Sequence, residues 1–93
     1  MCIIYRGRDS MDLLIVEDDP IIRDGMSEYL SEWGYHVIEA RDGREALSLF
    51  NKDIKIVLLD IQLPFMNGLD VLKEIRKESN IPVLMLTAFN NEE

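Results

Sequence analysis

One stretch near the middle of the chain decides the fold: VLLDIQLP, residues 57–64. An apolar run that ends in an acid is typical of a buried strand with a carboxylate at its tip, and open α/β sheets bind ligands at the carboxyl ends of their strands. A second apolar run, Leu13 to Val16, is followed directly by the acids Glu17, Asp18 and Asp19. If the two strands are parallel neighbours, at least three carboxylates meet in one crevice.

A group of carboxylates in one crevice predicts a cation site. Like charges a few ångströms apart repel and raise one another's pKa values, and a hard divalent cation removes that repulsion. Oxygen ligands without paired histidines or cysteines favour Mg²⁺, with Mn²⁺ as a substitute, over zinc. A metal beside an acid at a strand tip also indicates phosphoryl chemistry, in which Asp60 is the nucleophile and becomes an aspartyl phosphate.

Length and composition predict one domain. The chain has 93 residues, of which 47% are hydrophobic, enough for one core and too few for two domains. Eighteen acidic and ten basic residues give a net charge of -8, which argues against direct nucleic-acid binding. Cys2 is the only cysteine, and no run approaches the roughly 18 apolar residues of a membrane span, so we expect a cytoplasmic protein.

The alternation of apolar runs and amphipathic stretches predicts repeated β-α units and a parallel sheet covered on both faces. Residues 1–11 do not join this pattern, so we interpret them as an N-terminal extension and residues 12–93 as the domain. The second of four expected strands is the most polar, which indicates a sheet edge. The strands are expected at 12–16, 36–40, 55–60 and 82–87.

The first expected helix has clear start and stop signals. It begins at Pro20 behind the cap residue Asp19 and runs to about Trp33, and Gly34 ends it. Its apolar residues recur at spacings of three and four, which predicts that they lie in the core. These residues are Ile22, Met26, Tyr29, Leu30 and Trp33.

Two further helices carry their own caps. The second begins near Gly43, after a capping box in which the Asp42 side chain accepts one N–H and Glu45 reaches back for another. The third is capped by Asn67 and runs to about Glu78. Each helix therefore starts at a residue with a strong preference for that position.

Together these motifs resemble the receiver domains of two-component response regulators. The resemblance covers the chain from about residue 12 to its last residues and also includes the second loop and helix, residues 40–47. The matched residues are the paired acids, the acid at the tip of the third strand, the proline four residues later, the M-x-G turn and the Thr-Ala that ends the fourth strand: Glu17, Asp18, Asp60, Pro64, Met66, Gly68, Thr87 and Ala88.

The resemblance implies a flavodoxin-like, doubly wound α/β sheet of order 2-1-3-4 that lacks the family's final β-α unit. It implies that Asp60 accepts a phosphoryl group from a histidine kinase, and that Thr87 hydrogen-bonds this group and acts as a switch. Glu17, Asp18, Asp60 and the backbone carbonyl of Gln62 would bind Mg²⁺. Such a protein catalyses its own phosphorylation and dephosphorylation and is not an enzyme with a separate substrate.

The chain stops at Glu93, whereas the family continues with a fifth strand that carries a lysine, an aromatic switch residue and a fifth helix. Without the last β-α unit we expect open apolar surface on the sheet and first helix, and a second copy or another polypeptide that covers it. The missing lysine leaves a second interpretation open, namely a degenerate or truncated receiver that acts only as a protein-interaction module.

A third interpretation is an aspartate-nucleophile phosphatase similar to the haloacid dehalogenases, which share the parallel sheet and the acid at a strand tip. Those enzymes need a D-x-D arrangement, because the second acid protonates the leaving group. Gln62 stands at that second position, and the chain has no room for a cap domain over a substrate. We therefore favour this interpretation least.

Overall fold

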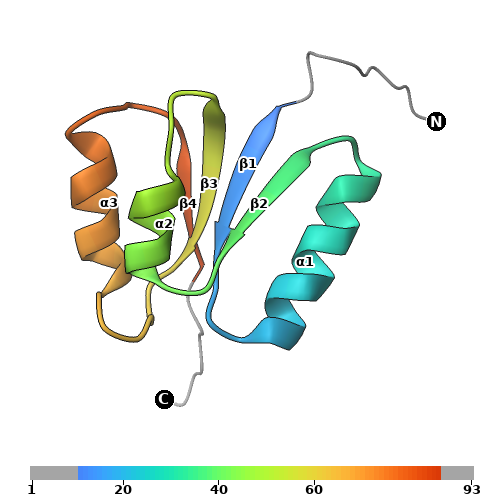
Figure 1. The fold of residues 1–93 in the computed structure, drawn as a ribbon, viewed down its shortest axis with the longest axis horizontal. Helices are drawn as coiled ribbons and strands as arrows, with labels where there is room; N and C mark the ends of the chain where they lie inside the picture. The colour runs from blue at the N-terminus through green and yellow to red at the C-terminus, as the bar shows by residue number, and fades with distance from the viewer. Residues whose placement is uncertain (1–10, 87–93) are drawn as a thin grey trace.

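The apolar runs form a four-stranded parallel sheet with helices on both faces in the computed structural model, which describes residues 11–86 (Figure 1). The elements follow the chain as β1 (Asp12–Val16), α1 (Pro20–Glu32), β2 (His36–Ala40), α2 (Gly43–Leu49), β3 (Ile54–Asp60), α3 (Gly68–Arg76) and β4 (Val83–Leu86). The strand order is β2-β1-β3-β4. This order confirms the predicted flavodoxin-like sheet and the edge position of β2.

The ends of three elements differ slightly from the sequence prediction. β3 begins one residue earlier, at Ile54, β4 begins one residue later, at Val83, and α3 ends at Arg76, before the predicted Glu78. The last turn of α3 closes early because the N–H of Lys77 donates to the carbonyls of Glu74 and Ile75. Thr87, predicted to end the fourth strand, lies outside the described residues.

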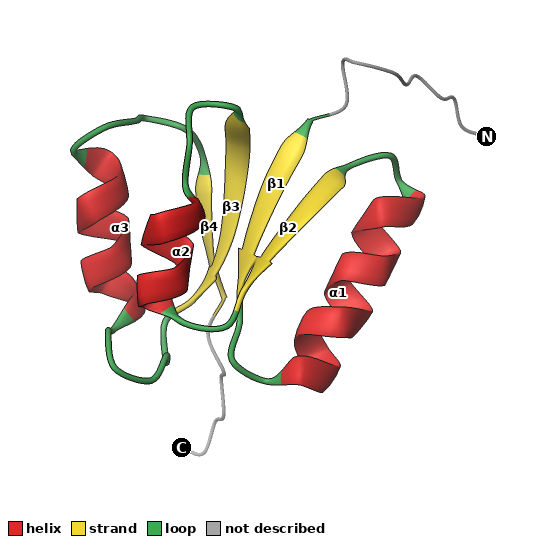
Figure 2. Ribbon diagram, in the orientation of Figure 1, coloured by secondary structure: helices red, strands yellow, loops and turns green. Residues whose placement is uncertain are grey.

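The core lies between the sheet and the helix pair α2 and α3. Figure 2 shows these two helices on one face of the sheet and α1 on the other. Side chains alternate between the faces of a strand, so Leu14 and Val16 of β1 point toward α2 and α3, and Leu13 and Ile15 point toward α1. The fully buried residues of the core are Leu14, Val16, Ala40, Ala46, Ile54, Val57, Leu59, Val71 and Ile75.

α1 ends in the way that Gly34 predicts. The residue has a φ of 96°, a left-handed conformation that glycine adopts without a steric penalty. Its N–H donates to the carbonyl of Ser31 at 3.0 Å, and the N–H of Tyr35 donates to that of Leu30 at 3.3 Å. This pair of bonds is a Schellman motif, which satisfies two carbonyls of the last helical turn.

The prediction that the apolar stripe of α1 lies in the core is wrong. No residue of α1 is buried, and Ile22, Tyr29 and Trp33 are 48%, 60% and 65% exposed. The half-buried positions are 23, 26, 27 and 30, so only Met26 and Leu30 of the predicted stripe face the sheet, together with Arg23 and Ser27. The physical reason is that α1 contacts β1 and β2, and no second helix packs beside it in the described part of the chain.

The capping box of α2 also differs from its prediction. Asp42 caps the helix as expected, because its side chain accepts the N–H of Glu45 at 2.9 Å. The Glu45 carboxylate, however, accepts the N–H of Arg41 at 2.7 Å and not that of the cap residue. Asp42 has an extended φ of -157°, and in this conformation the N–H of the preceding residue, Arg41, points to the Glu45 carboxylate.

No helix within residues 11–86 has the length and apolar character needed to cross a membrane.

Substitution by alanine should change the free energy of unfolding in opposite directions at two of the glycines. A Cβ at Gly25 in α1 would meet no atom within 4 Å, whereas a Cβ at Gly68 would clash with the carbonyl oxygen of Asp60 and lie 2.7 Å from the Cα of Ile61. We expect Gly25→Ala to raise the free energy of unfolding by about 1 kcal/mol and Gly68→Ala to lower it by about 1 to 3 kcal/mol. Urea denaturation measures both; a Gly68→Ala variant as stable as the native chain would contradict the close approach.

Candidate functional site

The parallel register of β1 and β3 places two acids side by side. Val16 pairs with Leu59, so the next residues along the two strands, Glu17 and Asp60, lie at adjacent strand tips. The N–H of Glu17 donates to the carbonyl of Ala40 at 3.1 Å, which extends the pairing of β1 with β2 by one residue. Glu17 is therefore held against β2, and the preceding residue, Val16, is held against β3.

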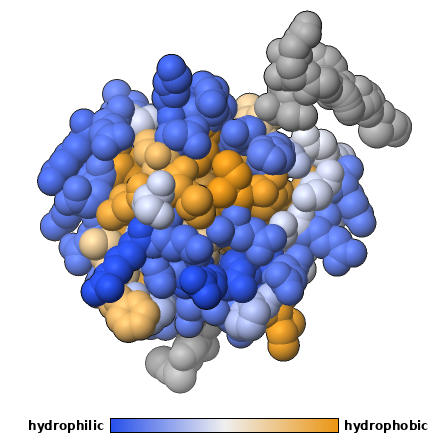
Figure 3. Space-filling model, in the orientation of Figure 1, coloured by the Kyte–Doolittle hydropathy of each residue, from blue (hydrophilic) through white to orange (hydrophobic). Residues whose placement is uncertain are grey.

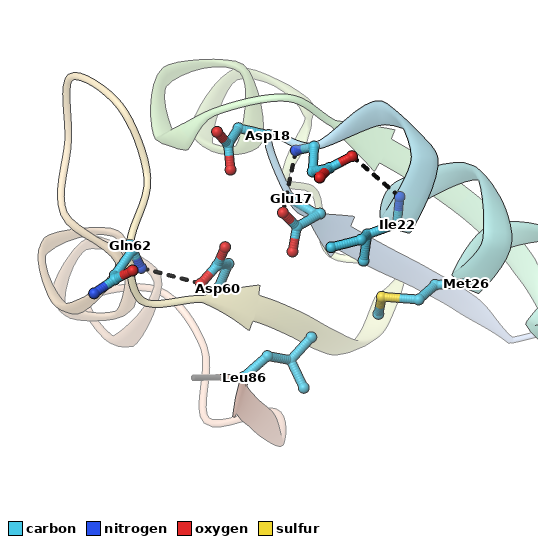
Figure 4. Close-up of a pocket in the computed structure, with 8 residues that line it drawn as sticks. Glu17, Asp18, Ile22, Met26, Asp60, Gln62 and Leu86 are labelled. Atoms are coloured by element: carbon cyan, nitrogen blue, oxygen red, sulfur yellow. Dashed lines mark hydrogen bonds between the residues drawn. The ribbon is translucent and has the colours of Figure 1, made fainter. Parts of the chain in front are cut away.

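Three carboxylates meet at this edge of the sheet. Glu17, Asp18 and Asp60 each offer an oxygen that lies within 4.8 Å of the other two. Glu17 and Asp60 are only 6% and 8% exposed, whereas Asp18 is exposed. Figure 4 shows the three side chains pointing toward one another at the mouth of a pocket. The structure thus brings together three of the acids that the sequence singled out.

Asp19, the fourth acid, belongs to the start of α1. Its side chain accepts the N–H groups of Ile21 at 2.9 Å and Ile22 at 3.4 Å, which is the contact of an N-cap. Its own N–H donates to the Glu17 carboxylate at 3.1 Å. The cap therefore fixes both the first turn of the helix and the orientation of the neighbouring acid.

The turn after β3 fixes Asp60 in a similar way. The N–H of Gln62 donates to the Asp60 carboxylate at 3.1 Å. Farther along, the N–H of Gly68 donates to the carbonyl of Ile61 at 2.9 Å, and the missing side chain of Gly68 lets α3 begin directly against this turn. The start of α3 thus packs against the backbone that carries Asp60.

The turn between β3 and α3 contains one strained residue. Phe65 has a φ of 66°, which is rare for a residue with a side chain, and the N–H of Met66 donates to the carbonyl of Pro64 at 2.7 Å. The guanidinium of Arg44 lies over the exposed Phe65 ring, 5.5 Å from its centroid, so a cation-π contact from α2 holds this turn.

The electrostatics of the pocket disfavour three ionised acids in the absence of a cation. Burial raises the pKa of the Glu17 carboxyl above its ordinary value, and the charges of Asp60 and Asp18 raise it further. The hydrogen bond from the N–H of Asp19 opposes this shift only in part. The Glu17 carboxyl therefore resists ionisation in this site.

An open pocket of about 450 Å³ lies beside the acids. One wall is acidic and also contains Gln62, and the other is apolar and is formed by Ile22, Met26 and Leu86 (Figure 4). Such a pocket has room for a cation and a small anion on the acidic side. The apolar wall keeps water away from one side of the carboxylates and strengthens the interactions among charges there.

The donor atoms fit Mg²⁺. Two ligands on one Mg²⁺ lie at most about 4.2 Å apart, because each bond is about 2.1 Å long. The separations of up to 4.8 Å need only a small side-chain rotation to reach this range. Glu17 and Asp60 each use one carboxylate oxygen on a backbone N–H, which leaves the other for a cation. Oxygen ligands alone are what a hard divalent cation prefers.

The remaining sequence-predicted site residues have different outcomes. Gln62 lines the pocket, as its predicted role as a carbonyl ligand requires. Thr87 lies outside the described residues, directly after Leu86, which pairs with Asp60. No sequence motif marked Arg23, whose Nη1 donates to the carbonyl of Glu17 at 2.9 Å. A signal was present, because Arg23 is the first basic residue after the acids and lies one helical turn beyond the cap.

The fold and the position of the site define a doubly wound protein of the flavodoxin-like class, with its crevice at the carboxyl ends of β1 and β3. Residues 13–93 match the family described as the response regulator receiver domain, and the chain belongs to that family. It is thus a receiver domain of two-component signalling.

Curated relatives are response regulators and transcriptional regulators. Response regulator RR06 of Streptococcus pneumoniae is 42% identical over 83 residues, which cover 88% of this chain and 38% of that protein. The CpxR homolog of Haemophilus influenzae, a transcriptional regulatory protein, is 49% identical over 76 residues, which cover 82% of this chain and 34% of that protein. The chain thus spans less than two fifths of the length of these relatives.

Solved receiver structures share the fold. The response regulator TrrA from Thermotoga maritima in complex with Mg(2+)-BeF has a TM-score of 0.77 and 40% identity, and the match covers 85% of this chain and 70% of that one. The chemotaxis response regulator CheY4 of Vibrio cholerae has a TM-score of 0.81 and 35% identity, with 88% of this chain and 72% of that one covered. Both likenesses support the assignment to the receiver family.

The raised pKa of Glu17 predicts a pH-dependent gain in stability on its replacement. Because the folded-state pKa lies above that of the unfolded chain, ionised Glu17 destabilises the metal-free fold, and this penalty is absent at pH values below both pKa values. We expect Glu17→Gln to raise the melting temperature of the metal-free chain at pH 7 by a few degrees, since about 1 kcal/mol corresponds to about 4 to 8 °C in a domain of this size.

The thermal melts are compared at pH 7 and pH 4 with the same charge change at an exposed site. Glu28→Gln in α1 is this control, because Glu28 is exposed and far along the helix from the acids. The difference between Glu17→Gln and the native chain should shrink toward zero at pH 4, where Glu17 of the native chain is protonated. An equal gain from Glu28→Gln would mean that net charge, and not the site, sets the effect.

Proposed function

We propose that this chain accepts a phosphoryl group on Asp60 from the phosphohistidine of a histidine kinase, with Mg²⁺ bound by Glu17, Asp18, Asp60 and the backbone carbonyl of Gln62. The observation that carries the proposal is the approach of three carboxylates to within 4.8 Å at adjacent strand tips of a receiver domain. A largely buried acid cluster of this kind is costly to the fold unless a cation and a phosphoryl group use it.

In the proposed reaction a carboxylate oxygen of Asp60 attacks the phosphorus atom of the donor. A new O–P bond forms, and the bond from phosphorus to the donor imidazole nitrogen breaks with its electron pair remaining on the imidazole, which takes up a proton. The N–H of Gln62 holds one oxygen of Asp60 at 3.1 Å, so the carboxylate is oriented before the donor arrives. The product is an aspartyl phosphate.

The other residues of the site serve this chemistry through charge and position. Mg²⁺, when bound, neutralises charge that builds up on the carboxylates and on the phosphoryl oxygens. Glu17 and Asp18 would hold it, and the structure of TrrA in complex with Mg(2+)-BeF supports such a site in this family. We assign to Thr87 the hydrogen bond to the phosphoryl group and the switch role; Thr87 follows Leu86, whose pairing with Asp60 supports this assignment.

We propose that residues 12–93 form the receiver unit, that residues 1–11 are an extension, and that the phosphotransfer takes place in the cytoplasm. A single cysteine supports this location. The CpxR homolog is a transcriptional regulatory protein, and this chain covers only 34% of that protein. For this chain we therefore propose only that phosphorylation changes the surface of the receiver domain.

Phosphorylation from a small donor tests the proposal. We expect acetyl phosphate with Mg²⁺ to add a single phosphoryl group to the native chain, and Asp60→Asn to abolish the adduct, because the amide lacks the nucleophilic oxygen. Intact mass spectrometry at acid pH detects the adduct, which base should remove. Omission of Mg²⁺ should slow its formation at least 10-fold, since the acid cluster alone repels the donor.

The matched control is Asp53→Asn, because Asp53 is exposed and lies just before β3, at the end of the strand opposite Asp60. This variant should accept phosphate like the native chain. A folded native chain without any adduct would contradict the proposal and favour a receiver-like module that acts only by binding a partner protein. An adduct that persists in Asp60→Asn would place the phosphoryl group on another residue.

We also propose that a second copy of this chain covers the open face of α1 and β4. Leu84 is 52% exposed and, by alternation with the core residues Val83 and Met85, faces the same side of the sheet as α1. On the side of the molecule that Figure 3 shows, which is not the side of β4, apolar side chains gather between the helical layers and polar side chains cover most of the remaining surface. β4 is an edge strand within the described sheet, and identical edges pair across a two-fold axis, which favours a second copy over other partners.

Sedimentation velocity over a range of concentrations tests this contact. We expect the native chain to associate at micromolar concentrations and Leu84→Asn to shift the association to concentrations at least 10-fold higher, because a polar amide replaces an apolar contact. Leu69→Asn is the control, since Leu69 is 48% exposed but belongs to α3 on the other face. A well-folded native monomer at every concentration would rule the contact out.

A further inference from the structure

Arg23 is a largely buried cation one helical turn beyond the acids. Its side chain is only 13% exposed, although arginine is among the residues most often found at the surface. It lies on the stripe of α1 that faces the sheet, together with residues 26, 27 and 30. A guanidinium in this position needs hydrogen-bond partners, and the contacts that it makes show what it positions.

The contacts of Arg23 join three elements at the site. Nη1 donates to the carbonyl oxygen of Glu17 at 2.9 Å, and Nε donates to the Glu39 carboxylate of β2 at 3.3 Å. The carbonyl of Glu17 belongs to the peptide that links Glu17 to Asp18. Arg23 therefore holds the peptide plane from which the Asp18 carboxylate extends, and Glu39 in turn holds the guanidinium.

The orientation of the Asp18 side chain depends on this hold on its backbone. It is the exposed member of the acid cluster, and no hydrogen bond to its side chain is present among the described residues, whereas Glu17 and Asp60 each accept a backbone N–H. Its direction is set through its backbone alone. A rotation of the Glu17–Asp18 peptide would turn its carboxylate out of the pocket.

We propose that Arg23 is a positioning residue of the acidic site: its hydrogen bond to the Glu17 carbonyl orients the Glu17–Asp18 peptide so that the Asp18 carboxylate points at the cation. The inference rests on the proposed function, because it concerns the Mg²⁺ site of that function. Glu39 compensates the charge of Arg23, so the effect of Arg23 on the site acts through orientation and not through its charge.

The direction of the change in Mg²⁺ affinity separates orientation from charge. Removal of a positive charge from a protein of net charge -8 would by itself strengthen the attraction for a cation. A charge effect therefore predicts tighter binding after loss of any arginine. An orientation effect predicts weaker binding, and only after loss of Arg23.

The experiment is calorimetric titration of the native chain, Arg23→Met, Arg23→Lys and the control Arg76→Met with Mg²⁺. Arg76 is a suitable control because it also donates to backbone carbonyls, those of Ser79 and Ile81, at the far end of α3. We expect Arg23→Met to weaken Mg²⁺ binding about 10-fold, as loss of a residue that orients a metal ligand does. Arg23→Lys, whose ammonium group can still donate to the Glu17 carbonyl, should lose less, and Arg76→Met should lose nothing.

A second readout does not depend on bound metal. The ¹H-¹⁵N resonance of the Asp18 amide belongs to the peptide that Arg23 holds, so it should shift in the metal-free Arg23 variants and stay in place in Arg76→Met. If the native chain binds no Mg²⁺, the proposed function fails and this resonance still decides the positioning role. If Arg23→Met does not fold, Arg23→Lys gives both readouts. Unchanged or tighter Mg²⁺ binding, or an unmoved Asp18 resonance, would overturn the proposal.

Discussion

Repulsion among three carboxylates at adjacent strand tips is the constraint on which the rest of this structure depends. The register of β1 and β3 forces Glu17 and Asp60 to stand side by side, and neither can move away without breaking the pairing of Val16 with Leu59. Both strands are apolar and fully buried just below these acids, so the energy that holds the charges together comes from the core. The burial that stabilises the sheet thus also raises the pKa of Glu17.

The acids are held almost entirely through backbone groups. The N–H of Asp19 holds Glu17, the N–H of Gln62 holds Asp60, and the carbonyl of Glu17 is held by Arg23. A backbone N–H occupies only one oxygen of a carboxylate, whereas a side-chain cation would neutralise the whole group and compete with a metal. The arrangement therefore fixes the acids in place and keeps oxygen atoms available for a cation.

Much of this arrangement could be predicted from the sequence because the signals are local. The apolar runs define the strands within one residue, and Asp19, Asp42 and Asn67 cap the helices as their positions indicate. The orientation of α1 could not be predicted in this way. Periodicity identifies an apolar stripe but not what covers it, and here packing against β1 and β2 turns Arg23 inward while Trp33 is 65% exposed. Glu45 was assigned to the wrong N–H for a similar reason, since the extended backbone of Asp42 decides that contact.

Two residues beside the site, Arg23 and Gly68, are explained by backbone atoms of the acids. An inward arginine on α1 looks like a defect in an amphipathic pattern, yet its position is explained by the carbonyl of Glu17, a backbone atom that no sequence pattern displays. The same holds for Gly68, which the sequence marks as part of a turn and the structure explains by the carbonyl of Asp60. In both cases the backbone that carries an acid determines which residue fits: an arginine that donates to it, or a glycine that leaves room for it. The geometry of the site therefore extends beyond its carboxylates to residues whose chemistry alone would not have drawn attention to them.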